Sequence, residues 1–593
     1  MTIRKTALLF LLSVTISQSV RAQLSEGGLP LTMEPNLHNQ LSAQLYVPTV
    51  ALTAPDIDAL RREDSVAHTG TLRIGALVDA DIDIKNLGSI VSLNDGRKIW
   101  RLKIQVPGMQ ALGLYYDHFR LPNGVKYYLY NANGKQVLGA YSSNENPGDG
   151  NAWANEKVQG EMINLEMDID PDVDISTINL HINNVAVFYR ATAYLQAYAT
   201  SGANLRTTAN TIFGHYDSSS SCEVEAMCAP GTSFPNQRNA AIHIEYVSHG
   251  FAYAGSGTLV NNTLQDCTPY VLTATHILNS QNNGNSTFAQ WIFYFNYQKP
   301  TCTYSGPEPS ASQTVIGAYF RARAPYDSSS NKIVGDFMLL LLKSNPTSYG
   351  FYLAGWDNTN STSLFNSGTF TCFHHPWGDV KKVAQSTSTD GTASFNNGIL
   401  IKSHWGVEWG IGGDEEGSSG SGLFNASGRL IGILSGGSVQ TQPCAATNSG
   451  GQKMSDYALF SKLSFDWFYT AYSPSSASTR LVDWLDPTGS GVTTLNGLTA
   501  CTTAIPEQQK NSDTWNVYPN PTNGIFYITQ PLTNVSNTSI ALYNMMGMLV
   551  SPSIQIDNGN RYKLDISNYP AGIYTVRIIQ GNTVISHKIT LSR

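Results

Sequence analysis

The chain has 593 residues, a formal net charge of -7, and a composition of 41% hydrophobic, 10% aromatic and 13% charged residues. This length is too great for one domain, and the hydrophobic content predicts folded domains. A weakly acidic chain lacks the basic surface that nucleic-acid binding requires, so we expect no nucleic-acid partner.

Residues 1–22 have the pattern of a signal peptide. A basic start, MTIRK, precedes the apolar run ALLFLLSVTI, and SQSVRA ends on a small residue. We therefore predict export, with cleavage after Ala22. The apolar run is far shorter than the about 20 residues that span a bilayer, and no later run is long enough, so we expect no transmembrane segment.

Residues 23–216 contain no cysteine and consist of strand patterns separated by turns. The segments RKIWRLKIQV, LGLYYDHFRL and VKYYLYNANGKQVLGAY alternate apolar and polar residues, and Asn-Gly pairs offer hairpin turns. We expect a β-sandwich-like unit without a catalytic group of residues.

Residues 217–497 continue the β pattern and hold six of the chain's seven cysteines. Disulfides are expected in an exported protein, and the lack of any CxxC pair argues against zinc. Because the cysteine count is odd, at least one is unpaired or pairs outside the chain. The polar segment AIPEQQKNSDT predicts a linker over residues 498–514.

Three segments of this second region favour nucleophilic catalysis. The strand pattern TPYVLTATHIL leads to His276, NKIVGDFMLLLLK places Asp336 before an apolar strand, and GSSGSGLF places Ser419 in a turn between glycines. A serine hydroxyl needs a histidine base and an acid that orients this base. Small neighbours would let the N–H groups of Gly417 and Ser419 face one point, as oxyanion donors must.

The same region resembles the lysyl endopeptidases, a secreted branch of the chymotrypsin-like serine proteases. The matching segments, in order, are SSSCEVEAMCAPG, GTLVNNT, LTATH, FNYQKPTC, GDFMLLLL, LAGWD, HHP, GSSGSGLF and RLVDWLDP. The resemblance implies a mainly β, double β-barrel protease domain with His276, Asp336 and Ser419 as catalytic triad. It also implies that residues 23–216 are a propeptide that aids folding or inhibits and is removed.

A pocket for lysine needs a buried negative charge. The family places an aspartate in a Ser-Asp segment that enters a strand, here KMSDYALFSKL, which makes Asp456 the candidate. The acidic residues 414–416 are then interpreted as a solvated loop. Ser435, Gly436 and Gly437 match the segment that pairs with the substrate backbone. Because Ser435 replaces the family's histidine and TASFNNGIL lacks its aromatic shield, we also expect some cleavage after arginine.

The resemblance also implies disulfides and excludes a metal at His374-His375. It pairs Cys222 with Cys444 and Cys228 with Cys302; Cys267 with Cys372 would be a replacement bridge, which leaves Cys501 unpaired. Adjacent residues on a strand point to opposite faces, so the two histidines are expected to be structural. We expect no metal and no cofactor.

Residues 515–593 resemble the C-terminal sorting domain of type IX secretion cargo in Bacteroidetes. The matching residues are Tyr518-Pro519-Asn520-Pro521, Gly524, Tyr543-Asn544 with Gly547, Leu564-Asp565-Ile566 and Pro570-Ala571-Gly572-Ile573-Tyr574. The resemblance implies a small β-sandwich and transport across the outer membrane by that machinery. Release and surface attachment both stay open.

The favoured hypothesis is a secreted endopeptidase that forms an acyl-enzyme at Ser419 and cleaves protein or peptide substrates after lysine. One alternative is a glutamyl endopeptidase of the same fold, which would need a cationic or histidine-lined pocket. A second alternative is a non-catalytic adhesin or inhibitor on a protease scaffold.

Overall fold

The structure of the protein is a computed structural model. It describes residues 27–34, 37, 46–66, 71–147, 152–190, 218–278, 284–305, 313–325, 335–346, 349–360, 369–393, 403–438, 457–468, 476–499, 515–529, 538–544, 549–550, 552–557, 561–580 and 583–592. The predicted signal peptide, Asp456, Cys444 and Cys501 lie outside these residues. The chain divides into two compact units, residues 1–502 and 503–593, and each is described by itself.

The N-terminal part of the first unit is a pair of sheets around one core. One sheet has the order β1 (Thr49–Ala51), β4 (Lys98–Gln105), β10 (Met162–Ile169), β6 (Val125–Asn131) and β7 (Val137–Tyr141), with β3 (Ser89–Ser92) beside β4. The other contains β2 (Leu72–Asp83), β11 (Asn179–Phe188), β5 (Ala111–Arg120), β8 (Trp153–Ala154) and β9 (Val158–Gln159). Side chains from both sheets, such as Leu102, Leu129, Leu114 and Val185, fill the core. The predicted sandwich is therefore present, and helix α2 (Ile57–Val66) precedes β2.

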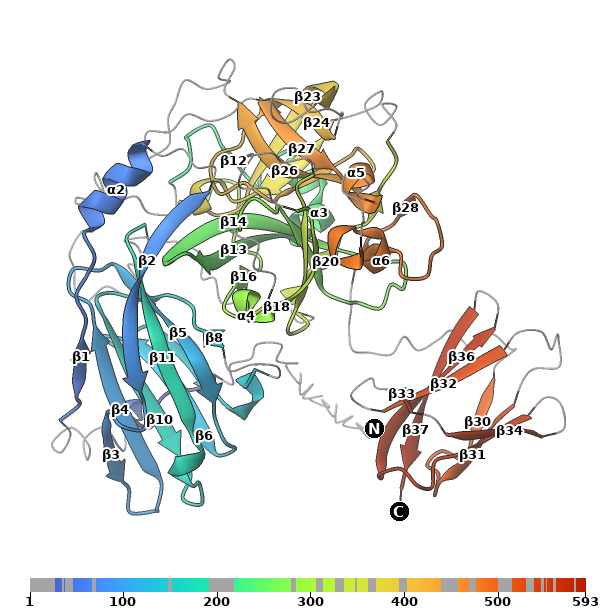
Figure 1. The fold of residues 1–593 in the computed structure, drawn as a ribbon, viewed down its shortest axis with the longest axis horizontal. Helices are drawn as coiled ribbons and strands as arrows, with labels where there is room; N and C mark the ends of the chain where they lie inside the picture. Colours follow the sequence, from blue (N-terminus) through green and yellow to red (C-terminus); the bar gives the residue numbers. More distant parts are fainter. Residues whose placement is uncertain are drawn as a thin grey trace, which may run out of the picture. The chain divides into compact units, whose positions relative to one another are not determined.

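Strand β2 connects this sandwich to the next region of the unit. Residues 75–83 of β2 pair with β11, and residues 72–76 pair antiparallel with β14 (Phe251–Val260), with Leu72 opposite Ala254 (Figure 1). One continuous sheet therefore runs through both regions, which the sequence pattern did not predict.

The seven strands β13 to β19 form a closed barrel, because β17 and β18 act as one strand bent at Gly317. Their order is β17 (Thr314–Ile316), β16 (Ile292–Tyr294), β13 (Ala241–Ser248), β14, β15 (Tyr270–Thr273), β19 (Met338–Leu342) and β18 (Ala318–Arg323). Short helices α3 (Pro235–Ala240) and α4 (Asn285–Phe288) lie in its connections. Barrel closure removes free strand edges.

A second barrel follows from residue 371 onward. It has the order β25 (Gly422–Phe424), β22 (Thr371–His374), β23 (Lys382–Ala393), β24 (His404–Ile411), β27 (Tyr457–Lys462) and β26 (Leu430–Ser438), and the β25–β26 pairing closes the ring. The remaining elements are β12 (Val224–Glu225), β20 (Tyr352–Leu353), β21 (Trp356–Asp357), α5 (Leu463–Phe468), α6 (Val482–Leu485), β28 (Thr494–Leu495) and β29 (Leu498–Thr499). The expected double β-barrel is thus confirmed.

The second unit is a small sandwich of two four-stranded sheets. One sheet has the order β30 (Asn516–Tyr518), β31 (Ile525–Thr529), β35 (Arg561–Asp565) and β34 (Ser553–Asp557). The other has β33 (Leu549–Val550), β32 (Thr538–Asn544), β36 (Gly572–Gln580) and β37 (Thr583–Leu591). Phe526 and Leu564 of the first sheet pack with Leu542 and Val576 of the second.

Among the described residues, no helix is both long and apolar enough to cross a membrane.

Candidate active site

His276 and Asp336 lie at the same end of two neighbouring strands. His276 follows β15 and Asp336 precedes β19, and these strands are paired antiparallel with Thr273 opposite Met338. The backbone N–H of His276 donates to Asp336 Oδ1 at 3.0 Å, and its Nδ1 lies 2.7 Å from Oδ2. The strand pairing therefore places the carboxylate against the ring.

Ser419 lies in a turn that packs directly against the first barrel. We call residues 413–421 the Ser419 loop. Gly420 has a φ of +87°, and a Cβ there would lie 2.1 Å from Thr273 Oγ1 and 2.4 Å from the Ser256 carbonyl oxygen. Only glycine allows this backbone so close to β14 and to the end of β15.

Ser256 of β14 fastens the Ser419 loop at two points. Its N–H donates to the carbonyl oxygen of Ser419 at 2.9 Å, and its hydroxyl donates to that of Gly417 at 2.8 Å. The Ser419 hydroxyl oxygen then lies 2.9 Å from His276 Nε2. Asp336, His276 and Ser419 consequently form one hydrogen-bonded row across the two barrels.

The peptide planes of the Ser419 loop are also fixed. The carbonyl oxygen of Glu416 accepts from the N–H of Trp377 at 2.5 Å, and that of Ser418 accepts from Ser421 at 3.1 Å. In a trans peptide the N–H points opposite to the carbonyl group. The N–H groups of Gly417 and Ser419 therefore point away from these two partners.

A second layer of hydrogen bonds holds Asp336. Burial alone would raise its pKa, but the charge on His276 and the hydrogen bonds from His276 and the Ser435 side chain outweigh burial and lower this pKa. The Ser435 hydroxyl also lies 3.1 Å from Nε2 of His404, whose Nδ1 is 2.8 Å from Ser403 Oγ. Burial lowers the pKa of His404 to about 4, so this ring is neutral at neutral pH.

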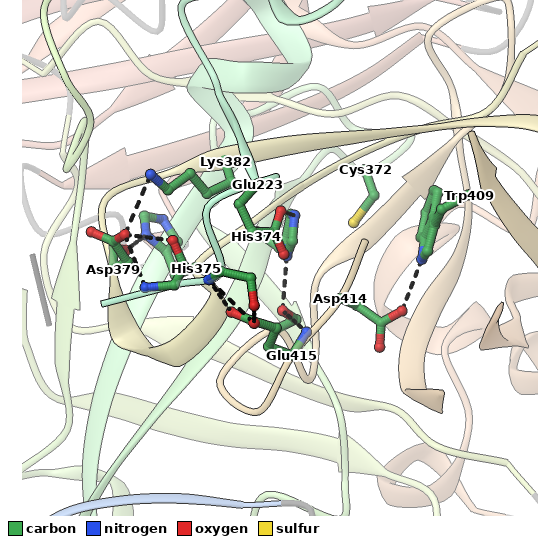
Figure 2. Close-up of polar contacts among 12 residues, drawn as sticks. Glu223, Cys372, His374, His375, Asp379, Lys382, Trp409, Asp414 and Glu415 are labelled. Atoms are coloured by element: carbon green, nitrogen blue, oxygen red, sulfur yellow. Dashed lines mark hydrogen bonds and ion pairs between the residues drawn. The ribbon is translucent and has the colours of Figure 1, made fainter. Parts of the chain in front are cut away.

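The opposite flank of the Ser419 loop carries a group of buried acids, Glu223, Asp379, Asp414 and Glu415, which we call the acidic cluster (Figure 2). Asp414 accepts from Trp409 Nε1 at 2.8 Å, and Glu415 accepts from the N–H and hydroxyl of Ser220. The interpretation of residues 414–416 as a solvated loop is therefore wrong for Asp414 and Glu415, which are 6% and 7% exposed. Packing of the segment around Ser220 on the loop buries them.

The carboxyl groups of the acidic cluster have few positively charged or hydrogen-bonding partners. Lys382 lies 3.3 Å from Asp379, but neither carboxyl oxygen of Glu223 has a hydrogen-bond partner among the described residues. Burial and the neighbouring Glu415 raise the pKa of Glu223 well above its usual value, and burial raises that of Glu415 to about 7. Both carboxyls are therefore protonated over much of the acidic pH range.

His374 and His375 make separate hydrogen bonds near the Ser419 loop. His374 Nδ1 lies 2.8 Å from Ser418 Oγ, whereas His375 Nδ1 lies 2.9 Å from the carbonyl oxygen of Asp379. Both rings are fully buried, and burial lowers the pKa of His374 to about 3. The two rings have different partners, but His375 lies just after the end of β22, so strand alternation does not account for this, and their structural role stays a prediction.

The residues expected to bind substrate are only partly described. Gly436 and Gly437 lie on β26, half-buried and exposed respectively, whereas Ser435 is buried behind Asp336. Asp456 lies outside the described residues, so its role stays a prediction. Sequence reasoning missed Ser256, His404 and Glu223, because their importance comes only from contacts with distant strands.

The predicted disulfides are correct in part. Cys228 is bonded to Cys302, as expected, and Cys222 and Cys267 are also disulfide-bonded. The pairing of Cys267 with Cys372 is wrong, because Cys372 is a free, buried thiol whose sulfur lies 3.2 Å from Ser421 Oγ. Its position in β22 seals it inside the second barrel. The pairing of Cys222 with Cys444 stays a prediction.

Comparison with known proteins found two family matches and a curated relative. Residues 216–458 match the family model "Lysyl endopeptidase, C-terminal domain", and residues 516–592 match "Secretion system C-terminal sorting domain". A lysyl endopeptidase of Pseudomonas aeruginosa is 26% identical over 375 residues, which cover 60% of this chain and 72% of that protein.

Solved structures with similarity include three proteases. A thermostable serine protease from an extremophilic microorganism has 13% identity and a TM-score of 0.26, and covers 38% of this chain and 93% of its own. The protease Anisep of Arthrobacter nicotinovorans has 17% identity, a TM-score of 0.24 and coverage of 38% and 91%. A Glu endopeptidase has 15% identity, a TM-score of 0.23 and coverage of 42% and 91%. The fold assignment rests on the closed barrels and on the matched family.

Residues 216–458 thus match the lysyl endopeptidase family model, the protein is a serine endopeptidase, and residues 516–592 are a type IX secretion sorting domain that directs the protein to the cell surface or into the medium.

Proposed function

We propose that the protein hydrolyses peptide bonds after lysine through an acyl-enzyme at Ser419. The observation that carries this proposal is the row of hydrogen bonds from Asp336 through His276 to the Ser419 hydroxyl, at 2.7 and 2.9 Å. The ring takes the hydroxyl proton while the oxygen attacks the scissile carbonyl carbon. Asp336 holds the ring in orientation and stabilises its charged form.

The oxyanion of the tetrahedral intermediate would be held by the N–H groups of Gly417 and Ser419. Support comes from the bonded carbonyl groups of Glu416 and Ser418, since these hold both peptide planes in place before substrate arrives. His276 then gives its proton to the leaving amine. Water hydrolyses the ester in the reverse sequence of proton transfers.

Lysine specificity is the finer part of the proposal, and we assign the pocket charge to Asp456. The matched family and the Pseudomonas relative, both named for lysyl endopeptidases, support it. Gly436 and Gly437 on β26 leave room for an extended substrate backbone. Some cleavage after arginine follows, because a carboxylate binds either cation.

Matched peptides that differ only in Lys, Arg or Glu before the scissile bond test this proposal. We expect turnover of the lysyl peptide, weaker turnover of the arginyl peptide, and a loss of about 10⁴–10⁶-fold in kcat for Ser419→Ala. Asp456→Asn should lower kcat/KM for lysine by roughly 10²–10³-fold. Turnover of the glutamyl peptide alone would transfer the assignment to glutamyl endopeptidases, and no turnover at all would favour a non-catalytic protein.

We also propose that residues 23–216 are a propeptide that restrains the protease until cleavage. Support comes from β14, because one edge of this strand pairs with β2 at residues 251–254 and holds the Ser419 loop through Ser256. β2 therefore occupies the strand edge next to the nucleophile. N-terminal sequencing of the active secreted protein should give a start near residue 217; a fully active chain that begins near residue 23 would contradict the proposal.

A further inference from the structure

The N-terminal sandwich carries a group of metal-ligating side chains on three adjacent strands. Asp81 belongs to β2, Asp117 and His118 to β5, and His181 to β11 between them. Asp117 Oδ1 lies 2.5 Å from His181 Nδ1 and 3.1 Å from His118 Nδ1. None of these residues takes part in the Ser419 site.

A β-bulge brings these side chains together. Along the β5–β11 ladder, His181 is opposite His118 and Ile182 is opposite Tyr116, so Asp117 is an extra residue without its own partner. In a regular strand, Asp117 and His118 would point to opposite faces of the sheet. The bulge interrupts this alternation, and both side chains meet His181.

The donor atoms suit a transition metal. One ligand atom from each of Asp117, His118 and His181 lies within 4.8 Å of the other two. Two imidazoles with one carboxylate favour Zn²⁺ and similar ions, whereas Ca²⁺ and Mg²⁺ prefer oxygen ligands alone. The side chains are 43%, 47% and 25% exposed, which leaves access for the ion and for water as a fourth ligand.

Asp81 adds the outer-sphere contact that is common at such sites. Its Oδ1 lies 2.9 Å from His181 Nε2 and would accept the ring proton at this nitrogen once a metal displaces the proton that Nδ1 shares with Asp117. That hydrogen bond leaves Nδ1, the nitrogen that faces Asp117, to act as the ligand. Metal-binding histidines ordinarily donate their other N–H to a carboxylate in this way.

We propose that Asp117, His118 and His181 bind one divalent transition-metal ion of the Zn²⁺ class, with Asp81 orienting His181. The ion joins β5 to β11 across the bulge, where the ladder lacks regular pairing. The site stabilises the N-terminal sandwich and supplies no chemistry to the protease.

Titration calorimetry with ZnCl₂ tests the proposal on the full chain with Ser419→Ala, which prevents self-digestion, after treatment with a chelator. His118→Ala and His181→Ala should each weaken the assigned binding event at least tenfold, and Asp81→Asn should weaken it about tenfold. His249→Ala, a change at an exposed histidine in another turn, should leave it unchanged.

Thermal unfolding without metal checks that each variant is folded, and with Zn²⁺ it gives a second readout. Zn²⁺ should raise the unfolding temperature of the parent and of His249→Ala, but not that of the double variant His118→Ala/His181→Ala. Equal zinc stoichiometry and affinity in the folded double variant and the parent would overturn the proposal. Unchanged affinity in Asp81→Asn would overturn the role of Asp81.

Discussion

Two buried polar networks lie beside the Ser419 loop, one around Asp336 and one around Glu415, and the pKa values of these two carboxyl groups shift in opposite directions. Asp336 and Glu415 are both largely buried, yet the pKa of Asp336 is lowered and that of Glu415 is raised to about 7. The hydrogen bonds from His276 and Ser435 and the charge on His276 outweigh burial at Asp336, whereas at Glu415 burial outweighs the hydrogen bonds from Ser220 and the nearby Asp379 raises the pKa further. Burial alone does not set the charge of a carboxyl group; the neighbours of that group decide it.

The largest expected effect on kcat comes from a change at Asp336. Asp336→Asn should lower kcat by about 10⁴-fold, because an amide cannot hold His276 in the required tautomer or stabilise its charge. The matched control is Asp466→Asn. Asp466 is also buried, and burial raises its pKa well above the usual value. It accepts from the Ser461 hydroxyl, which accepts from the Asp336 N–H, and an amide oxygen can keep this bond. Steady-state kinetics on the lysyl peptide should show near-native kcat for the control, and similar losses in both variants would contradict the comparison.

A substitution that displaces the Ser419 loop should lower activity. Gly420→Ala would place a methyl group against Thr273 and Ser256, and we expect about 10²-fold lower kcat, since small misplacements of reacting groups are costly. Gly489→Ala is the control, because Gly489 also has a positive φ but a Cβ there has nothing within 4 Å. This control separates backbone strain from the clash. A normal kcat in Gly420→Ala would show that the close approach is not needed.

The acidic cluster should make stability depend on pH. A raised carboxyl pKa means that the folded chain holds protons that the unfolded chain releases, so stability is full below about pH 4.5 and falls as pH rises through about 7. For Glu415 alone this corresponds to ~3 kcal/mol. The double variant Glu223→Gln/Glu415→Gln should lack this contribution. The unfolding free energy of the parent relative to that of the variant, measured with urea, should therefore fall as the pH rises from 5 to 8.

The exposed Glu408→Gln is the matched control for the acidic cluster and should retain the slope of the parent protein. A difference in unfolding free energy between the parent and the double variant that stays constant over this pH range would show that Glu223 and Glu415 are not held protonated.

The smallest expected effect on kcat comes from a change at Ser435, whose hydroxyl donates to Asp336. Ser435→Ala removes one of its hydrogen bonds and leaves His404 Nε2 without this partner, so kcat should fall about tenfold, in line with the ~1.5 kcal/mol of a hydrogen bond to a charged group. KM should stay unchanged, because the Ser435 side chain faces Asp336 and His404. A rise in KM with unchanged kcat would place this hydroxyl in substrate binding instead.

Much of the fold could be predicted from the sequence, because alternation of apolar residues and Asn-Gly or Gly turns report strands locally. The pattern around His276 and Asp336 correctly predicted two strand ends, although β15 already ends at Thr273. The glycines around Ser419 correctly predicted an ordered turn. Disulfide partners were harder, since Cys372 carries no local signal that its barrel would seal it from other cysteines.

The sequence by itself determined the strands, the turn at Ser419 and the order of the candidate catalytic residues, because these depend on neighbouring residues and on short motifs. Only the tertiary structure decided that Glu415 is buried, that Ser256 holds the loop and that a bulge joins Asp117 to His181. Such features arise where segments far apart in the chain meet. The solvation and hydrogen bonding of a polar group depend on those meetings, which no local pattern encodes.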